Sequence, residues 1–242
     1  VEIVWGDTSL HLPWSCNSGG SQTIHAMTRA AHAAATDAIT KLQQIAARDL
    51  GGRPQDYVVS GERVSRKGGG GGMTLAQAAK RAIELGGVYD GHELPKDINA
   101  MTTRSATALA GQGLMGVGKD TYKRDGTTRS FSAAFAEVEV DIETGKYTVT
   151  EFLSVADVGI VIHPTALGGQ VLGRSNLGIA HAIGHRWVYD QRYGVGLARR
   201  FYNNSPPTIL DIPLNSAWDS VGLPDPETPV GARGIGEPPV AA

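Results

Sequence analysis

The chain reads Gly231-Ala232-Arg233-Gly234-Ile235-Gly236-Glu237-Pro238-Pro239 close to its end, with one carboxylate between flexible glycines and two prolines. Glycine lets the backbone approach a ligand closely, whereas proline fixes φ and keeps the following chain extended. A carboxylate on such a loop can be aimed at one point and partly removed from water. This setting suits proton transfer and would make Glu237 a usable general base. Taken alone, however, a Gly-Glu-Pro stretch is more often a surface turn with a solvated carboxylate.

Helices are predicted from apolar residues at three-and-four spacing and from their start and stop signals. Gly51 and Gly52 end the first helix, Thr74 and Gln77 form the capping box of the second, and Pro164 marks the start of the third. The predicted helices are Thr23–Leu50, Leu75–Leu85 and Thr165–Ile183.

Strands and loops fill the remainder of the chain. The predicted strands are Val1–Trp5, Tyr57–Ser60, Glu62–Ser65, Phe131–Ile142, Tyr147–Val155 and Thr208–Ile212. The five glycines of Gly68–Gly72 predict a flexible connection, and residues 90–129 are expected to be mostly loop. Helices interspersed with hairpins favour an α+β fold of mixed helices and mainly antiparallel strands, with sub-domains over 1–120 and 121–242.

The composition narrows the class of protein. The chain has 242 residues, of which 41% are hydrophobic and 19% charged, and its net charge is −2. These values are typical of a globular protein and give no reason to expect nucleic acid or an anionic membrane as a partner. No apolar run reaches 18 residues, so no transmembrane segment is expected. One cysteine, Cys16, excludes an internal disulfide.

Two further motifs carry groups that could bind a ligand. Ser18-Gly19-Gly20-Ser21 lies just before the first predicted helix, where free backbone amides favour an anion or a hydrogen-bond acceptor. The same turn could instead cap the helix and contact only water. Gln170 lies near the start of the third helix and offers a donor and an acceptor together. It is either a ligand contact or a surface glutamine.

A glycine-rich run supports a different function. Gly111–Gly116 matches the pattern G-x-G-x-x-G, and Gly113–Lys119 matches G-x-x-x-x-G-K. A phosphate-binding loop needs a hydrophobic strand before it and a helix after it, and a Ser or Thr for magnesium. Here residues 102–110 are a poor buried strand, and Asp120 follows the lysine. A nucleotide-binding module therefore remains as the alternative function.

Other polar residues are assigned structural roles. His181 and His185 have the four-residue spacing of a zinc pair but lack the glutamate of H-E-x-x-H, so capping or packing is favoured. Cys16 could line a pocket near Gly19, although free cysteines usually behave as small buried hydrophobes. Three aspartates are expected to be caps or turn formers, namely Asp157, Asp211 and Asp225.

Several segments resemble, in order, the molybdenum hydroxylases, the family of xanthine dehydrogenase and aldehyde oxidoreductase. The matching segments are Val1–Ser9, Ser18–Thr23, Phe131–Asp141, Ala156–Pro164, Gly168–Gly173, Pro206–Leu214 and the loop around Glu237. The resemblance implies a C-terminal fragment of the large, molybdopterin-binding subunit. The N-terminal part of that subunit would then carry the remaining cofactor contacts, and we expect this fragment alone to be inactive.

The resemblance also implies chemistry and partners. Glu237 would be the base toward a molybdenum-bound hydroxyl, while Gly19, Gly20, Ser21 and Gln170 would contact molybdenum–molybdopterin with no protein ligand to the metal. The substrate would be an aldehyde or an N-heterocycle, and the pterin a cytosine dinucleotide if the source is bacterial. The resemblance further implies electron transfer through [2Fe–2S] clusters and FAD. A cluster takes four ligands and this chain has one cysteine, so these groups are expected on an iron–sulfur subunit and an FAD subunit, or on segments outside this chain. The cytoplasm is the expected location, with the periplasm as the alternative. A catalytically silent interaction domain is a third alternative.

Overall fold

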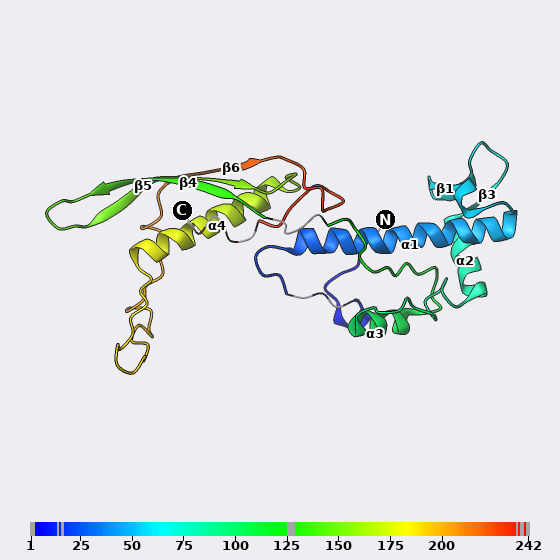
Figure 1. The fold of residues 1–242 in the computed structure, drawn as a ribbon, viewed down its shortest axis with the longest axis horizontal. Coiled ribbons are helices and arrows are strands. Elements are labelled where there is room, and N and C mark those ends of the chain that lie inside the picture. The colour runs from blue at the N-terminus through cyan, green and yellow to red at the C-terminus, as the bar shows by residue number, and fades with distance from the viewer. Residues whose placement is uncertain are drawn as a thin grey trace. The chain divides into compact units, whose positions relative to one another are not determined.

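The computed structural model describes residues 3–13, 15, 17–124, 129–235, 237 and 240. They divide into two compact units. The first unit comprises Val1–Asn17 and Met27–Tyr122, and the second comprises Ser18–Ala26 and Lys123–Ala242. Helix α1 (Thr23–Leu50) begins in the second unit and continues in the first. Figure 1 shows the elements of both.

The first unit combines helices with a small sheet. Strands β1 (Tyr57–Ser60), β2 (Arg63–Arg66) and β3 (Gly72–Thr74) form an antiparallel sheet in the order β1-β2-β3. Helix α2 (Leu75–Leu85) follows β3 directly, and α3 (Ala100–Leu109) comes later in the chain. Two short 3-10 helices complete the unit, η1 (Thr8–Leu10) and η2 (Pro54–Asp56).

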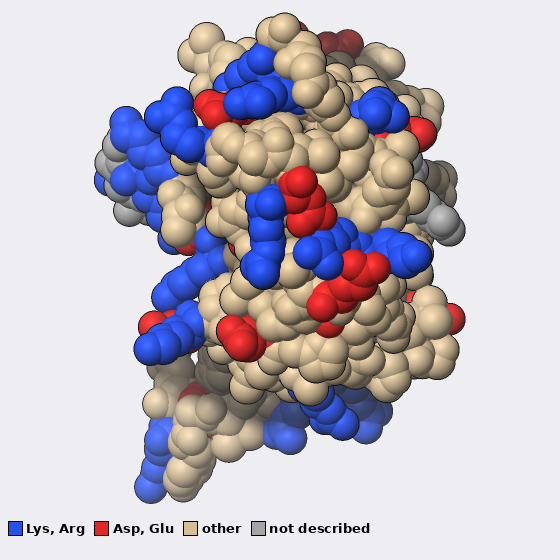
Figure 2. All heavy atoms as spheres, turned by 90° about the vertical axis from the view of Figure 1, so that its right-hand side faces the viewer, with Lys and Arg blue, Asp and Glu red and all other residues tan. Residues whose placement is uncertain are grey.

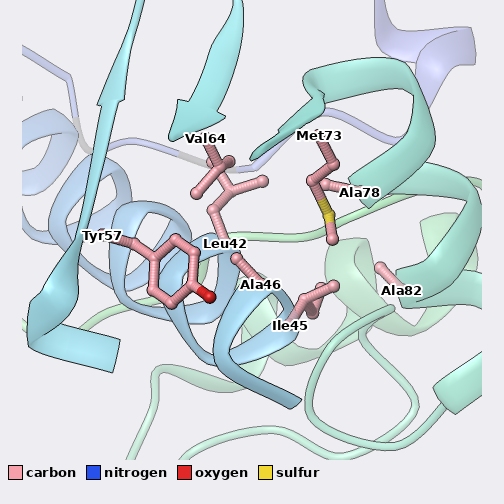
Figure 3. Packing of buried hydrophobic residues seen from close by; sticks show 8 residues of the cluster. All are labelled: Leu42, Ile45, Ala46, Tyr57, Val64, Met73, Ala78 and Ala82. Atoms are coloured by element: carbon pink, nitrogen blue, oxygen red, sulfur yellow. The ribbon is translucent and has the colours of Figure 1, made fainter. Parts of the chain in front are cut away.

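The core of the first unit lies where α1, α2 and the small sheet meet (Figure 3). Its buried residues are Leu42, Ile45, Ala46, Tyr57, Val64, Met73, Ala78 and Ala82. The Tyr57 ring is inside, and its hydroxyl donates to the Gly51 carbonyl oxygen at 2.6 Å. This bond ties the end of α1 to β1 and gives the buried hydroxyl a partner.

Charged side chains on one face of the molecule alternate in sign. Figure 2 shows Lys and Arg beside Asp and Glu there, not a broad field of one sign. In the first unit, Arg81 pairs with Asp49 and Glu84, each at 2.9 Å. Such exposed pairs contribute little to stability, about 0–1 kcal/mol each.

The second unit is a three-stranded sheet covered by one long helix. Strands β4 (Ser132–Val140) and β5 (Tyr147–Asp157) form an antiparallel hairpin, and β6 (Asn215–Val221) pairs with β5 in parallel. Helix α4 (Pro164–Ile183) connects β5 to the chain that leads to β6, and Figure 1 shows it along the sheet. A parallel pair needs such a crossover, so α4 is positioned by topology as well as by packing.

A glycine lets α4 lie close to the sheet. A Cβ atom on Gly168 would be 2.5 Å from Nε1 of Trp218 on β6. Only glycine avoids that contact, and it places the first turns of α4 directly over β6. The buried cluster of this unit is Ala156, Val158, Val171 and Ile235.

Most predicted helices and hairpins are confirmed, with four corrections. Thr208–Ile212 forms a turn, and the strand lies at β6 instead. Residues 90–129 contain helix α3, although they were expected to be mostly loop. Gly72 belongs to a third strand, β3, which the sequence did not indicate. Ile3–Trp5, the described part of the strand predicted over Val1–Trp5, is irregular. Among the described residues, no helix is both long and apolar enough to cross a membrane.

Candidate functional site

A cavity of about 550 Å³ lies at the start of α4 in the second unit. It is formed by three segments that are distant in sequence: the turn before α1, the segment from Val158 to Arg174, and the loop 232–235. Its polar lining residues are Ser18, Ser21, Thr23, His163, Gln170, Arg174 and Arg233. A cavity with apolar walls and a few convergent polar groups is the usual form of a small-molecule site.

The turn before α1 reaches the cavity through Ser21. Gly20 and Ser21 have φ of 64° and 54°, in the left-handed region. A non-glycine residue is strained there. Ser21 Oγ donates to Gln170 Oε1 at 2.9 Å, and this contact to α4 holds the turn. Gly19 and Gly20 belong to the same turn but do not line the cavity.

One face of α4 supplies the cavity's helical wall. His163, Ala166, Leu167, Gln170 and Arg174 recur at three-and-four spacing, so they share a face. His163 is the N-cap, and its Nδ1 accepts the backbone N–H of Ala166 at 3.1 Å. The Gln170 side-chain oxygen accepts the hydrogen bond from Ser21. In the described part of the chain, its amide nitrogen makes no bond and can donate to a ligand.

The C-terminal loop is held against the segment that follows β5 and passes close to the serine turn. Arg233 N donates to the Val158 carbonyl oxygen, and Ile160 N donates to that of Gly231, both at 2.8 Å. A Cβ atom on Gly234 would be 3.2 Å from the Ser21 carbonyl oxygen. Loop and turn therefore meet at one wall of the cavity.

Arg233 anchors this loop, which the sequence analysis did not foresee. Its Nε lies 3.1 Å from Asp225 Oδ2, and its Nη1 pairs with Asp157. The Asp225 side chain is only 2% exposed, so this pair is shielded from water. The signal in the sequence was an arginine within a glycine loop, with two aspartates earlier in the chain.

The three aspartates predicted to be structural are confirmed as such. Asp225 Oδ1 accepts the Glu227 N–H at 2.8 Å, and Asp157 pairs with Arg233. Asp211 accepts hydrogen bonds from the backbone and the hydroxyl of Thr208, which lower its pKa below the ordinary value. Each carboxylate therefore fixes a turn or a loop.

Glu237 lies beside the cavity and is more exposed than expected. Its side chain is 62% exposed, and its Oε1 is 3.4 Å from Nη1 of Arg174, a residue of the cavity wall. The expectation that this carboxylate is partly removed from water is therefore wrong. The Glu237 carboxylate is instead held beside the cavity by its ion pair with Arg174. Gly236, Pro238 and Pro239 lie outside the described residues.

The glycine-rich run at 111–119 packs against α1. A Cβ on Gly116 would be 2.4 Å from the Ala34 carbonyl oxygen, and one on Gly118 would be 2.6 Å from that of Ala33. Helix α3 precedes the run and an irregular segment follows it. The strand-loop-helix context of a phosphate-binding loop is absent here, so these glycines serve close packing.

The remaining candidates stay apart from the cavity. His181 lies in the last turn of α4, and its ring centroid is 5.1 Å from that of His185. In the part of the chain that the structure describes, no group of three or more His, Cys, Asp or Glu side chains could hold a metal ion. Cys16 lies outside the described residues.

The structure thus brings motifs from three segments to one cavity, an arrangement typical of small-molecule sites. The sequence matches the molybdopterin cofactor-binding domain family over residues 1–213. The chain belongs to this family. The resemblance to the molybdenum hydroxylases and the α+β fold class are thereby confirmed.

Relatives and solved structures agree with this assignment. The chain is 32% identical over 112 residues to a putative xanthine dehydrogenase molybdenum-binding subunit of Escherichia coli, covering 46% of this chain and 15% of that protein. It is 32% identical over 120 residues to the carbon monoxide dehydrogenase large chain of Afipia carboxidovorans, covering 49% and 14%. A crystal structure of Cu,Mo-CO dehydrogenase superposes with a TM-score of 0.65 at 27% identity, covering 94% of this chain and 26% of that one. The chain thus spans under a third of each of these proteins.

Proposed function

We propose that this chain forms part of the catalytic centre of a molybdenum-dependent hydroxylase that oxidises an aldehyde or an N-heterocycle with oxygen derived from water. The observation that carries the proposal is the Ser21–Gln170 hydrogen bond of 2.9 Å at the cavity wall. It joins two motifs that the family resemblance assigns to cofactor contact. The approach of Gly234 to Ser21 brings the third motif to the same wall.

The cavity suits a pterin with its polar edge toward α4. The Gln170 amide nitrogen and the Ser21 hydroxyl would hydrogen-bond that edge, with the amides of Gly19 and Gly20 close by. The apolar wall of Val158, Ile160 and Ile235 would cover the ring faces. When bound, the molybdenum–pterin group would supply the two-electron redox chemistry, and the protein supplies position.

Glu237 would act as the general base. A carboxylate at this position accepts the proton released as a water-derived hydroxyl attacks an electron-poor carbon of the substrate. Arg174 holds the carboxylate near the cavity wall through a 3.4 Å ion pair. Since the Glu237 side chain is largely exposed here, the proposed reaction needs the substrate or another part of the protein to cover it.

The assembly around this chain follows from the same proposal. Electrons would leave through [2Fe–2S] clusters and FAD on partner subunits, and the N-terminal part of the large subunit would complete the pocket. A cytosine dinucleotide form of the pterin is proposed. One relative, 23% identical over 237 residues, is named as subunit gamma of a 6-hydroxypseudooxynicotine dehydrogenase complex in Paenarthrobacter nicotinovorans. That name agrees with a multi-subunit assembly.

The direct test is molybdenum and pterin analysis of the intact complex, purified with its natural partners. We expect one molybdenum and one pterin per copy of this chain. Turnover in ¹⁸O-labelled water then tests the chemistry, because the hydroxylated product should carry the label. A complex that contains neither metal nor pterin, or a product without the label, would refute the proposal.

A further inference from the structure

The segment between α4 and β6 contains an arm, residues 185–204, which in Figure 1 extends away from the end of α4. Backbone hydrogen bonds close it into a hairpin. Asp190 N donates to the Val195 carbonyl oxygen at 2.8 Å, and Leu197 N to that of Val188 at 2.7 Å. The base is closed by Arg186 N, which donates to Asn204 Oδ1 at 2.9 Å. We call this segment the arginine arm.

The arginine arm carries a strong local excess of positive charge. It has four arginines and one carboxylate, on a chain whose net charge is −2. The carboxylate, Asp190, is used within the arm, since its Oδ1 accepts the backbone N–H groups of Arg192 and Tyr193. In the described part of the chain, none of the four arginines forms an ion pair; they are Arg186, Arg192, Arg199 and Arg200.

Large aromatic side chains of the arm are left in solvent. Trp187 is 82% exposed and Phe201 83%, and Tyr193 and Tyr202 exceed 70%. Single exposed hydrophobic residues are ordinary on protein surfaces, but four aromatic rings within one short hairpin are not. Trp, Tyr and Arg are the residues most enriched where protein interfaces bind most tightly.

A cavity of about 440 Å³ lies at the base of the arm and is positively charged. Its lining residues are His185, Ala198, Arg199, Arg200, Phe201, Asn204 and Pro206. No carboxylate lines it. The arm thus offers two guanidinium groups beside the Phe201 ring, which matches a carboxylate side chain with apolar neighbours.

We propose that the arginine arm docks onto an acidic surface of another protein of the assembly, with carboxylates entering the cavity at Arg199 and Arg200. Apolar side chains of that protein pack on Trp187 and Phe201. The composition favours a protein over nucleic acid, because the arm has no lysine and interface cores are enriched in Arg and aromatic residues but depleted in Lys. The inference rests on the multi-subunit assembly of the proposed function, but not on the contacts assigned to the pterin.

A zero-length cross-link tests the proposal without disturbing the charge. The variant Arg200→Lys keeps the cation and introduces the only amine of the arm, which a carbodiimide can couple to a carboxylate in direct contact. In the intact complex, we expect a cross-link between position 200 and an Asp or Glu of a different protein. A link to a second copy of this chain, a link within the same polypeptide, or no link would overturn the proposal.

Charge reversal measures the strength of the contact. With the cross-linked protein as the binding partner, Arg199→Glu combined with Arg200→Glu should weaken its association at least about tenfold. The dissociation constant of the original chain should also rise with salt. The matched control reverses two exposed arginines of the first unit, Arg48→Glu with Arg63→Glu, and should change the constant less than about twofold. Unchanged affinity in the arm variant would refute the proposal. The molybdenum content of the arm variant is measured separately, because it reports on the cofactor site and not on docking.

Discussion

Ser21 and Gln170 are 149 residues apart in the chain, yet the Ser21 hydroxyl donates a 2.9 Å hydrogen bond to the Gln170 side-chain oxygen. The bond fixes which end of the amide faces the cavity. The amide nitrogen is thereby presented as a donor, while the strained Ser21 backbone is held by its own side chain.

Ser21→Ala should therefore reduce the retention of pterin by the intact complex. The loss of one neutral hydrogen bond corresponds to about 0.5–1.5 kcal/mol, or roughly a twofold to twelvefold change in binding. The control is Ser18→Ala, because Ser18 lines the same cavity but forms no hydrogen bond among the described residues. Pterin release on dialysis is the measurement. Equal losses from both variants would contradict a specific role for Ser21.

Glu237→Gln should lower turnover by about 10²–10⁴-fold and leave the molybdenum content unchanged. The amide keeps the size of the side chain but cannot accept the proton. Glu143→Gln, which alters an exposed carboxylate in the turn between β4 and β5, should leave turnover as it is. Steady-state kinetics beside metal analysis separate the two effects. Full activity in the Glu237 variant would exclude this residue as the base.

Gly168→Ala should destabilise the second unit by about 1–3 kcal/mol, because the new methyl group would overlap the Trp218 ring. Gly173 lies further along the same helix, and a Cβ atom there would meet nothing within 4 Å. Gly173→Ala is therefore the matched control. That change should stabilise the helix by up to about 1 kcal/mol. Thermal unfolding of both variants checks the opposite signs. Stabilisation by both would show that α4 and β6 are not in close contact.

Ser154→Ala should stabilise the protein by about 1 kcal/mol. The Ser154 hydroxyl is fully buried on β5 and has no hydrogen-bond partner among the described residues. A buried hydroxyl without a partner carries an uncompensated desolvation penalty. Ser175→Ala is the matched control, since that buried hydroxyl donates to the Val171 carbonyl oxygen at 2.9 Å. The control should lose roughly 0.5–1 kcal/mol in chemical denaturation. Stability changes of the same sign in both variants would contradict the conclusion that the Ser154 hydroxyl lacks a hydrogen-bond partner.

Asp90 should contribute to the pH dependence of the first unit. Burial of its carboxyl opposes ionisation, but hydrogen bonds from the ring and the backbone of His92 outweigh it and lower the pKa of Asp90 below its ordinary value. The stabilisation from the ionised Asp90 carboxylate is fully present above the pKa of the unfolded carboxyl, about 4. It is lost as pH falls through the lower folded value.

The variant Asp90→Asn should consequently be less stable than the original chain at neutral pH, by about 1–3 kcal/mol. The gap should narrow as the pH is lowered toward about 3. Glu93→Gln changes an exposed neighbouring carboxylate and should show no such narrowing. Denaturation at a series of pH values provides the comparison. A constant gap would mean that the ionised form of Asp90 is not what stabilises this segment.

Local signals in the sequence were enough to place the elements whose boundaries depend on neighbouring residues. The capping box of Thr74 and Gln77 places α2 as predicted, and both of its reciprocal bonds are present. Helix α3 was missed because its sequence is rich in Thr and Ser and has no apolar period. Asn99, whose side chain accepts the Met101 N–H at 2.8 Å, was the available signal.

Elements that depend on distant contacts were not predictable in the same way. Strand β6 alternates Ser, Ala, Trp and Asp, and it becomes a strand by pairing with β5. The roles of Arg233, Arg174 and Gly168 likewise depend on partners elsewhere in the fold, at Asp225, Glu237 and Trp218. The candidate site was accessible only through the family resemblance, because each motif taken alone also describes an ordinary turn or helix surface.

The parallel pairing of β5 with β6 has a kinetic consequence. Glu151 is aligned with Asn215. The long chain between them, including α4, must therefore be organised before β5 and β6 can pair. Contacts that close large loops form late, since the entropy of closure is lost before any contact compensates for it. We therefore expect the wall of the cavity to assemble late in refolding. The antiparallel hairpin of β4 and β5, whose contacts are local, would form earlier and provide the edge to which β6 is added.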